Sequence, residues 1–279
     1  MATDNNILTY RQAGQVKLKC RINLDRLFQG KSERERFDSK WKKFIKSDEA
    51  NNGLFQKKDN KLSYDSEQLI PTKVNSKPPL LLVLGNPASH SVKNGMFFSF
   101  EGDGREHRFW KNILKPAGIL NFNSSKNFSN NRLNQQRKKQ LLELTYKSPY
   151  RIGLCVFLSM PSAPKGPWGG VAGIHKLIGA KAMRRLETEE SQRIVECAKR
   201  FIKRKGAVVT FQKNAWNALR SEKDPEYNIE LAKQGKLIGA LKVLPHIPMC
   251  GVPPTRLTGP CQRVLSRFFN EHGIRFKRI

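Results

Sequence analysis

The chain has 279 residues, 38% of them hydrophobic, which is enough for one large domain, alone or with an extension. Its 52 Lys and Arg against 23 Asp and Glu give a formal net charge of +29. This charge indicates a polyanionic partner, nucleic acid before an anionic membrane surface, and the alternative is a basic protein without such a partner. No apolar run reaches the roughly 20 residues of a membrane helix, and the first residues lack a signal-peptide core, so we expect an intracellular protein.

Residues 1–77 are expected to form a basic N-terminal extension. Apolar residues alternate with polar ones at 16–22, which predicts a short strand, and apolar positions at helical spacing over 37–45 predict one amphipathic helix. The rest is rich in Lys, Asn, Asp and Ser, which predicts loops or disorder. We expect the apolar stripe of the helix to dock on the main domain; contact of its basic face with DNA is the further possibility. Two prolines at 78–79 mark the start of a domain that spans residues 78–279.

Strands alternate with helices in this second domain. Short apolar runs predict four buried strands, at residues 80–84, 152–158, 207–211 and 241–244. Helical patterns are expected around residues 109–114, 135–146, 189–202, 214–219 and 260–272. Such alternation predicts a three-layer α/β/α fold with a central four-stranded parallel sheet.

Polar residues follow the predicted strands, at the carboxyl edge where open α/β sheets place their sites. Asn86 comes two residues after the first strand, where a catalytic residue would be expected. Ser159 and Ser162 follow the second strand and are expected to face the same pocket. His246 comes two residues after the fourth predicted strand. We expect the amide of Asn86, the ring of Phe98 and the imidazole of His246 to converge on one slot.

Three parts of the sequence resemble motifs of a known family. Gly85-Asn86-Pro87, then Asn94-Gly95-Met96-Phe97-Phe98-Ser99, then Arg108-Phe109-Trp110, resembles the first motif of the uracil-DNA glycosylase superfamily, closest to its mismatch-specific uracil and hypoxanthine branches. Residues 243–251 resemble the second motif, although Ile247 looks inserted and the motif's Ser is replaced. Lys213-Asn214 also resembles the family, with Gln212 where a Gly is usual.

The resemblance implies a monofunctional DNA glycosylase that flips out and excises a deaminated base in base-excision repair. Uracil is the first candidate, with hypoxanthine and xanthine as alternatives. The partner would be damaged duplex or single-stranded DNA, in the nucleus or nucleoid, and the protein would act as a monomer without a cofactor. The five cysteines are scattered without a Cys-x-x-Cys pair, so neither a zinc site nor an iron–sulfur cluster is expected.

Three residues carry the implied chemistry. Asn86 would orient the attacking water, because an amide cannot be a strong base; the alternative is that it caps its own turn. Phe98 would be the stacking platform for the base, worth about 1–3 kcal/mol, and core packing is the alternative. His246 would hydrogen-bond the base or the charge left on it, and the alternative is an ordinary loop histidine.

The remaining site residues are implied by the same motifs, except Ser159, which is placed by its position after the second predicted strand. Pro87 and Ser159 would help to bind the base. The DNA contacts would come from Lys213, Asn214, Met249, Gly251, Val252 and Arg256, with Met249 or Val252 as the wedge and Arg256 on a phosphate. The other charge runs, such as 137–139, are expected to be solvated helix faces.

Two other functions compete with the glycosylase. The altered second motif favours a nucleic-acid-binding protein on the same fold that has lost catalysis. A small-molecule enzyme of the doubly wound class is disfavoured by the charge and by the lack of a Gly-rich fingerprint.

Overall fold

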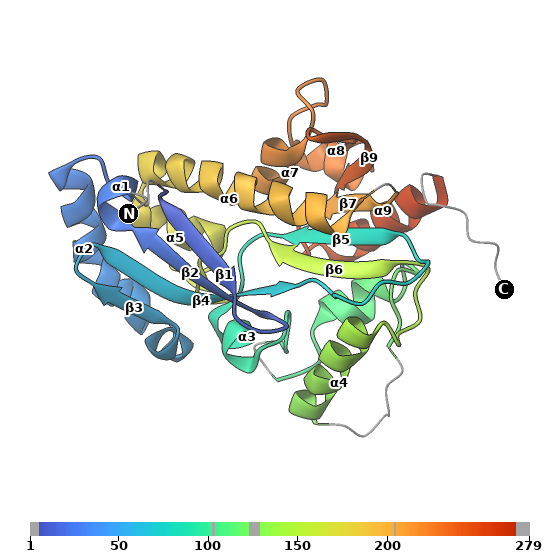
Figure 1. Cartoon of the computed structure of the whole chain (residues 1–279), viewed down its shortest axis with the longest axis horizontal. Helices are drawn as coiled ribbons and strands as arrows, with labels where there is room; N and C mark the ends of the chain where they lie inside the picture. The colour runs from blue at the N-terminus through green and yellow to red at the C-terminus, as the bar shows by residue number, and fades with distance from the viewer. Residues whose placement is uncertain (1–5, 102–103, 123–128, 204, 272–279) are drawn as a thin grey trace. The chain divides into compact units, whose positions relative to one another are not determined.

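The computed structural model describes residues 6–101, 104–122, 129–203 and 205–271. Within these ranges the chain is mixed α/β, with nine strands in parallel and antiparallel pairs and helices between them (Figure 1). It divides into two compact units. Unit 1 is Met1–Gln68, Gly85–Phe97 and Val156–Arg193, and unit 2 is Leu69–Leu84, Phe98–Cys155 and Ile194–Ile279. This division differs from a boundary at residue 77, because segments from both sides of that boundary join in unit 1.

Unit 1 has an antiparallel group of strands. β1 (Leu8–Gln12) pairs with β2 (Lys17–Asn23), and β2 pairs with β4 (Lys61–Leu69). β3 (Phe55–Lys58) pairs with the first residues of β4. The strand predicted around 16–22 is confirmed as β2, whereas the expectation of loops in the rest of this region is wrong.

The helices of unit 1 are α1 (Leu24–Leu27), α2 (Lys31–Lys46), the 3-10 turn η1 (Glu49–Gly53), α3 (Ser89–Asn94), α5 (Gly170–Ile178) and α6 (Ala180–Phe201), which continues into unit 2. The predicted amphipathic helix is confirmed as α2. It buries Phe37 and Phe44 fully, and the Phe44 ring meets Trp168 with centroids 6.2 Å apart. The apolar stripe therefore packs, as predicted, on a segment from beyond residue 78.

The sheet of unit 2 has the order β6-β5-β7-β9-β8. The strands are β5 (Pro79–Leu84), β6 (Arg151–Val156), β7 (Ala207–Thr210), β8 (Ile238–Leu241) and β9 (Leu244–Gly251). β5 and β9 both pair in parallel with β7, and β8 pairs with β9 in antiparallel fashion. Three predicted strands are confirmed as β5, β6 and β7, since apolar runs this short suit strands buried on both faces.

The predicted fourth strand, at 241–244, is wrong. β8 ends at Leu241, and β9 begins at Leu244 and runs beside β7, with Met249 opposite Val208. β9 contains Pro245 and Pro248. Proline has no N–H for a ladder, so its presence argues against a strand in a sequence. That is why the pattern placed the strand too early.

The helices of unit 2 are the π-helical turn η2 (Phe109–Leu114), α4 (Asn130–Glu143), α7 (Lys213–Leu219), α8 (Ile229–Lys233) and α9 (Thr258–Glu271). Both α4 and α6 begin earlier than predicted, α4 within the Asn- and Ser-rich stretch. The predicted end of the last helix at Gly273 lies outside the described residues.

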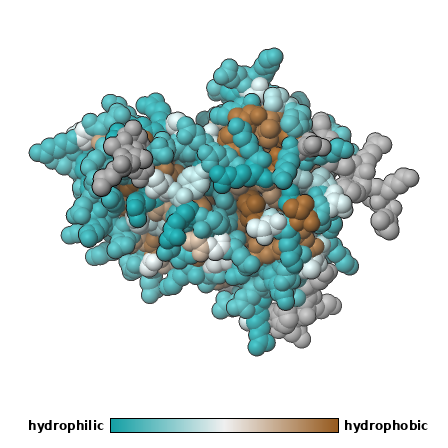
Figure 2. Space-filling view, in the orientation of Figure 1, coloured by the Kyte–Doolittle hydropathy of each residue, from teal (hydrophilic) through white to brown (hydrophobic). Residues whose placement is uncertain are grey.

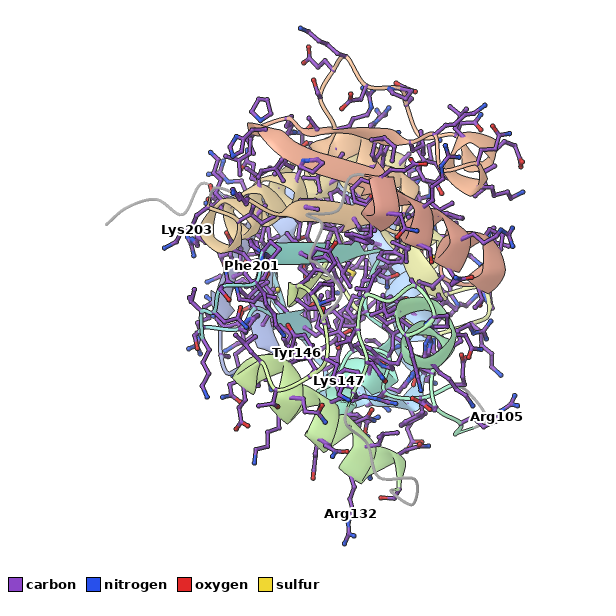
Figure 3. All side chains as sticks on the ribbon, turned by 90° about the vertical axis from the view of Figure 1, so that its right-hand side faces the viewer. Arg105, Arg132, Tyr146, Lys147, Phe201 and Lys203 are labelled. Carbon is purple, nitrogen blue, oxygen red and sulfur yellow. The ribbon has the colours of Figure 1, made fainter. Side chains whose placement is uncertain are left out.

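Polar and charged residues cover most of the face shown in Figure 2. Arg105, Arg132 and Lys203 are exposed and point outward in Figure 3. No helix in the described part of the chain is long and apolar enough to cross a membrane.

The buried carboxyl of Glu67 on β4 makes folding depend on pH. The residue is 3% exposed, and its Oε2 has no hydrogen-bond partner among the described residues. Burial raises the pKa of Glu67 well above its ordinary value of 4.5. The folded protein therefore keeps a proton that the unfolded chain releases, so this contribution to stability is complete below pH 4.5 and falls as the pH rises toward the raised pKa.

We predict that Glu67→Gln removes this dependence. Relative to the wild type, the variant should gain stability by up to about 1.4 kcal/mol for each pH unit within that window. Urea unfolding of both proteins at pH values from about 4.5 to about 8 measures the difference. A difference that stays constant across the series would show that Glu67 is not held neutral.

Candidate functional site

Asn86 lies in the loop that follows β5, and its side-chain amide is held on one side. Its Nδ2 donates to Ser162 Oγ (2.9 Å), to the Pro87 carbonyl (3.2 Å) and to the Met160 carbonyl (3.3 Å). Carbonyl oxygens only accept, so the NH₂ end must face them. The half-buried Asn86 receives no hydrogen bond on Oδ1 from the described residues. One end of the amide is fixed and the other is free to accept.

The loops after β5 and β6 are joined by backbone bonds. Ser89 N–H donates to the Ser162 carbonyl (2.9 Å), and Ser162 N–H donates to the Pro87 carbonyl (3.1 Å). Ala88 and Ser162 form a parallel bridge. The prediction that Asn86 and Ser162 lie at the same place is confirmed. Pro87 is buried and acts here through its backbone.

Ser159 does not face an open pocket, contrary to the prediction. It is fully buried, and its Oγ lies 2.5 Å from Glu190 Oε1 and 2.8 Å from the Tyr64 hydroxyl. Its backbone N–H also donates to Glu190 Oε1, at 2.6 Å. Burial raises the pKa of Tyr64 well above its ordinary value, so its phenol keeps its proton. A hydroxyl so engaged has no donor left for a base.

Behind Ser159 lies a buried ion pair on α6. Arg193 Nε donates to Glu190 Oε2 at 2.6 Å, and both side chains are 0% exposed. Arg193 Nη2 donates to the carbonyls of Val156 (2.5 Å) and Phe157 (3.1 Å). Both members of the pair therefore hydrogen-bond the backbone at and just after the end of β6. The sequence shows only an acid three residues before an Arg on a helix, which more often marks a solvated pair.

Phe98 lies in an aromatic cluster of unit 2. Its ring centroid is 4.2 Å from that of Phe109 and 4.5 Å from that of His107, and Trp110 Nε1 donates to its carbonyl (3.0 Å). Phe98 has a φ of 47°, a conformation that is strained for a non-glycine residue. The half-buried ring thus packs against two neighbouring rings, which is the contact pattern of a packing residue. Its role as a platform for a base stays a prediction.

Arg137 on α4 is not a solvated residue, contrary to the prediction. It is 3% exposed, forms an ion pair with Glu106, and its guanidinium lies 5.9 Å from the centre of the Trp110 ring. Burial lowers its pKa. Arg137 therefore braces the aromatic cluster from α4.

His246 is not at a carboxyl strand end, contrary to the prediction. It is exposed and is the third residue of β9. The pairs with β7 run from Met249 to Gly251, so His246 precedes them and lies toward the amino edge of these parallel strands. β5 ends at the opposite edge, at Leu84. Reading β9 as the loop after a strand produced this error.

The predicted wedge residues are part of the core. Met249 and Val252 are both 0% exposed. Gly251 is buried too, and a Cβ there would lie 2.8 Å from the Trp216 ring. Its glycine is explained by this close packing. Met249, Val252 and Gly251 are therefore all buried, and none of them is free to enter a duplex.

Two predicted DNA contacts stay available. Arg256 and Lys213 are exposed, and Lys213 is the first residue of α7. The half-buried Asn214 follows it. Gln212, where the motif has Gly, caps this helix by accepting from Asn214 N–H at 2.8 Å. The roles of Lys213, Asn214 and Arg256 on DNA stay predictions.

The described residues contain no group of three or more His, Cys, Asp or Glu that could hold a metal ion. All five cysteines are buried and free. No protein-family model and no curated protein matches the chain.

We predict that Glu190→Gln costs roughly 3–5 kcal/mol of unfolding free energy, because it leaves the Arg193 guanidinium buried without its anion. The double variant Glu190→Gln/Arg193→Met should lose less than the sum of the two single variants. Urea unfolding measures all of them. Glu196→Gln, on the exposed part of the same helix, is the control and should change stability by less than about 0.5 kcal/mol. A similarly small effect of Glu190→Gln would contradict the buried pair.

Proposed function

We propose that the protein is a monofunctional DNA glycosylase that excises a deaminated base, with uracil as the first candidate and hypoxanthine and xanthine as alternatives. The observation that carries the proposal is the amide of Asn86, fixed through Nδ2 and open at Oδ1. A carbonyl oxygen held in this way can accept a hydrogen bond from water and keep it oriented toward a sugar carbon. Water is the nucleophile, and no lysine adduct forms.

Three further points support the proposal. The residues around Asn86 resemble the first motif of the uracil-DNA glycosylase superfamily. The net charge of +29 suits a polyanionic substrate. Phe98 offers a braced ring on which an extruded base can stack. His246 is left out of the catalytic set because it lies toward the other edge of the strands.

We also propose the finer fold that this function implies. β6, β5, β7 and β9 would be the four-stranded parallel centre of a three-layer α/β/α domain, with β8 as an antiparallel addition. The protein would act as a monomer on DNA in the nucleus or nucleoid.

The second candidate is a nucleic-acid-binding protein of this fold that does not cleave. The burial of Met249 and Val252 favours it, since neither side chain can fill the gap left by an extruded base. In that case Asn86 caps the loops and DNA binding occurs without excision.

The test is incubation of the protein with duplexes and single strands that carry uracil, hypoxanthine or xanthine, followed by detection of abasic sites. The glycosylase proposal expects abasic sites with at least one of these bases. DNA binding without abasic sites on any substrate would favour the second candidate and overturn the first.

We predict that Asn86→Ala lowers the single-turnover excision rate by about 10²-fold, the scale on which misplacement of a reactant slows catalysis. Ser162→Ala removes one of the three bonds on Nδ2 and should lower the rate by about tenfold, equivalent to about 1.4 kcal/mol. Asn131→Ala, at an exposed Asn on α4, is the control and should leave the rate unchanged. Full activity of Asn86→Ala would contradict the assigned role.

A further inference from the structure

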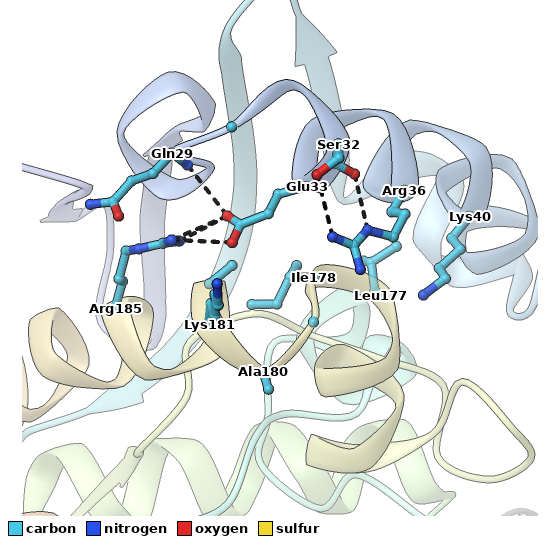
Figure 4. A pocket seen from close by; sticks show the side chains of 13 residues that line it. Gln29, Ser32, Glu33, Arg36, Lys40, Leu177, Ile178, Ala180, Lys181 and Arg185 are labelled. Carbon is cyan, nitrogen blue, oxygen red and sulfur yellow. Dashed lines mark hydrogen bonds and ion pairs between the residues drawn. The ribbon is translucent and has the colours of Figure 1, made fainter.

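A groove in unit 1 has no role in the site described above. It has a volume of about 670 Å³ and lies between the first turns of α2 and the segment that joins α5 to α6 (Figure 4). Leu177 and Ile178 contribute its apolar part, and both are buried. Gly30, which precedes α2, and Ala180, which begins α6, also line it.

Three cations of the groove lack a neutralising partner. Arg36, Lys40 and Lys181 line it, and none of them forms an ion pair with a carboxylate among the described residues. Arg36 Nε donates to the Ser32 carbonyl (3.0 Å) and Lys40 Nζ to the Lys176 carbonyl (2.9 Å). These bonds position the two cationic heads while leaving their charge uncompensated. Each head has further N–H donors to offer.

Glu33, the acidic residue among those that line the groove, already has a cationic partner. Glu33 forms an ion pair with Arg185, with Oε2 3.0 Å from Nη1, and also accepts from Gln29 N–H (3.3 Å). Arg185 also donates to the Leu27 carbonyl (2.6 Å). This pair joins the start of α2 to α6 and shapes the groove, and it neither adds to nor subtracts from the three free charges. The amino ends of α2 and α6 add positive potential through their helix dipoles.

The lining fits a sugar–phosphate backbone better than a membrane. An amphipathic segment that lies in a lipid surface presents exposed apolar side chains beside its cations. In the described part of the chain the exposed large hydrophobic residues are Val74 and Ile229, and both belong to unit 2. Arg and Lys heads that line a hollow can contact phosphates, and such contacts carry no base information.

We propose that this groove binds the phosphate backbone of nucleic acid, independently of the base that the strand carries. It would be a second contact of the protein with DNA, supplied by the N-terminal region. The inference rests on the proposed function only for the choice of DNA as the polyanion, because it requires no excision.

The test is the salt dependence of binding to an undamaged DNA duplex, measured by fluorescence anisotropy with the full chain. Neutralising three phosphate contacts in Arg36→Gln/Lys40→Gln/Lys181→Gln should make the slope of log K against log salt less steep by about 2.7. The matched control is Lys42→Gln/Lys46→Gln/Lys58→Gln. It removes the same charge from exposed lysines that do not line the groove, and it should keep the wild-type slope. The single variant Lys181→Gln, at an exposed position, should change the slope by about 0.9 and covers the case in which the triple variant unfolds.

The inference is overturned if the groove variants keep the wild-type slope, or if they change it no more than the control does. It is also overturned if these substitutions abolish binding to phosphatidylserine vesicles and leave DNA binding unchanged. If the groove variants have a less steep salt slope and the wild type produces no abasic sites, the groove proposal is supported and the glycosylase proposal is refuted. Excision with an unchanged slope would do the reverse.

Discussion

The buried pair of Glu190 and Arg193 is the interaction on which the proposed site depends. Its carboxylate holds the backbone and hydroxyl of Ser159, and its guanidinium holds two carbonyls at the end of β6. The loop that starts there supplies the carbonyl of Met160 and the hydroxyl of Ser162 to Asn86. The buried ion pair thus fixes the position of a short run of backbone, and that backbone orients the amide of Asn86.

Such a pair is expensive to bury, because two charges leave water. It becomes tolerable when the remaining donors and acceptors have partners, and here Ser159, Gln68 and the carbonyls of Val156 and Phe157 supply them. An apolar core could give equal stability. It could not give the same fixed direction to the strand end. We infer that the pair serves geometry more than stability.

The sequence indicated the central strands because β5, β6 and β7 are short apolar runs without internal breakers. It failed on β4, where a polar residue, Ser66, occupies a buried position and hides the alternation. It failed on β9 because two prolines interrupt the run. The error in β9 also misplaced His246. Because the strand was predicted several residues too early, His246 was expected at the carboxyl edge and lies toward the amino edge.

The sequence likewise predicted part of the site correctly and part of it wrongly. The position of Asn86 and Ser162 after predicted strands was sufficient to predict that they lie close together. It was not sufficient to separate Ser162 from Ser159, because two hydroxyls three residues apart differ only in which partner reaches them. That partner, Glu190, comes from a distant helix, and a single sequence gives no sign that an acid there is buried.

The most direct measurement is the hydrogen exchange of the Asn86 side-chain amide, followed by NMR in the full-length protein. If Nδ2 is held by three acceptors, its protons should exchange more slowly than those of the exposed Asn131, and Ser162→Ala should speed that exchange. Exchange as fast as that of Asn131 in the wild type would show that the amide turns freely, and it would contradict the account.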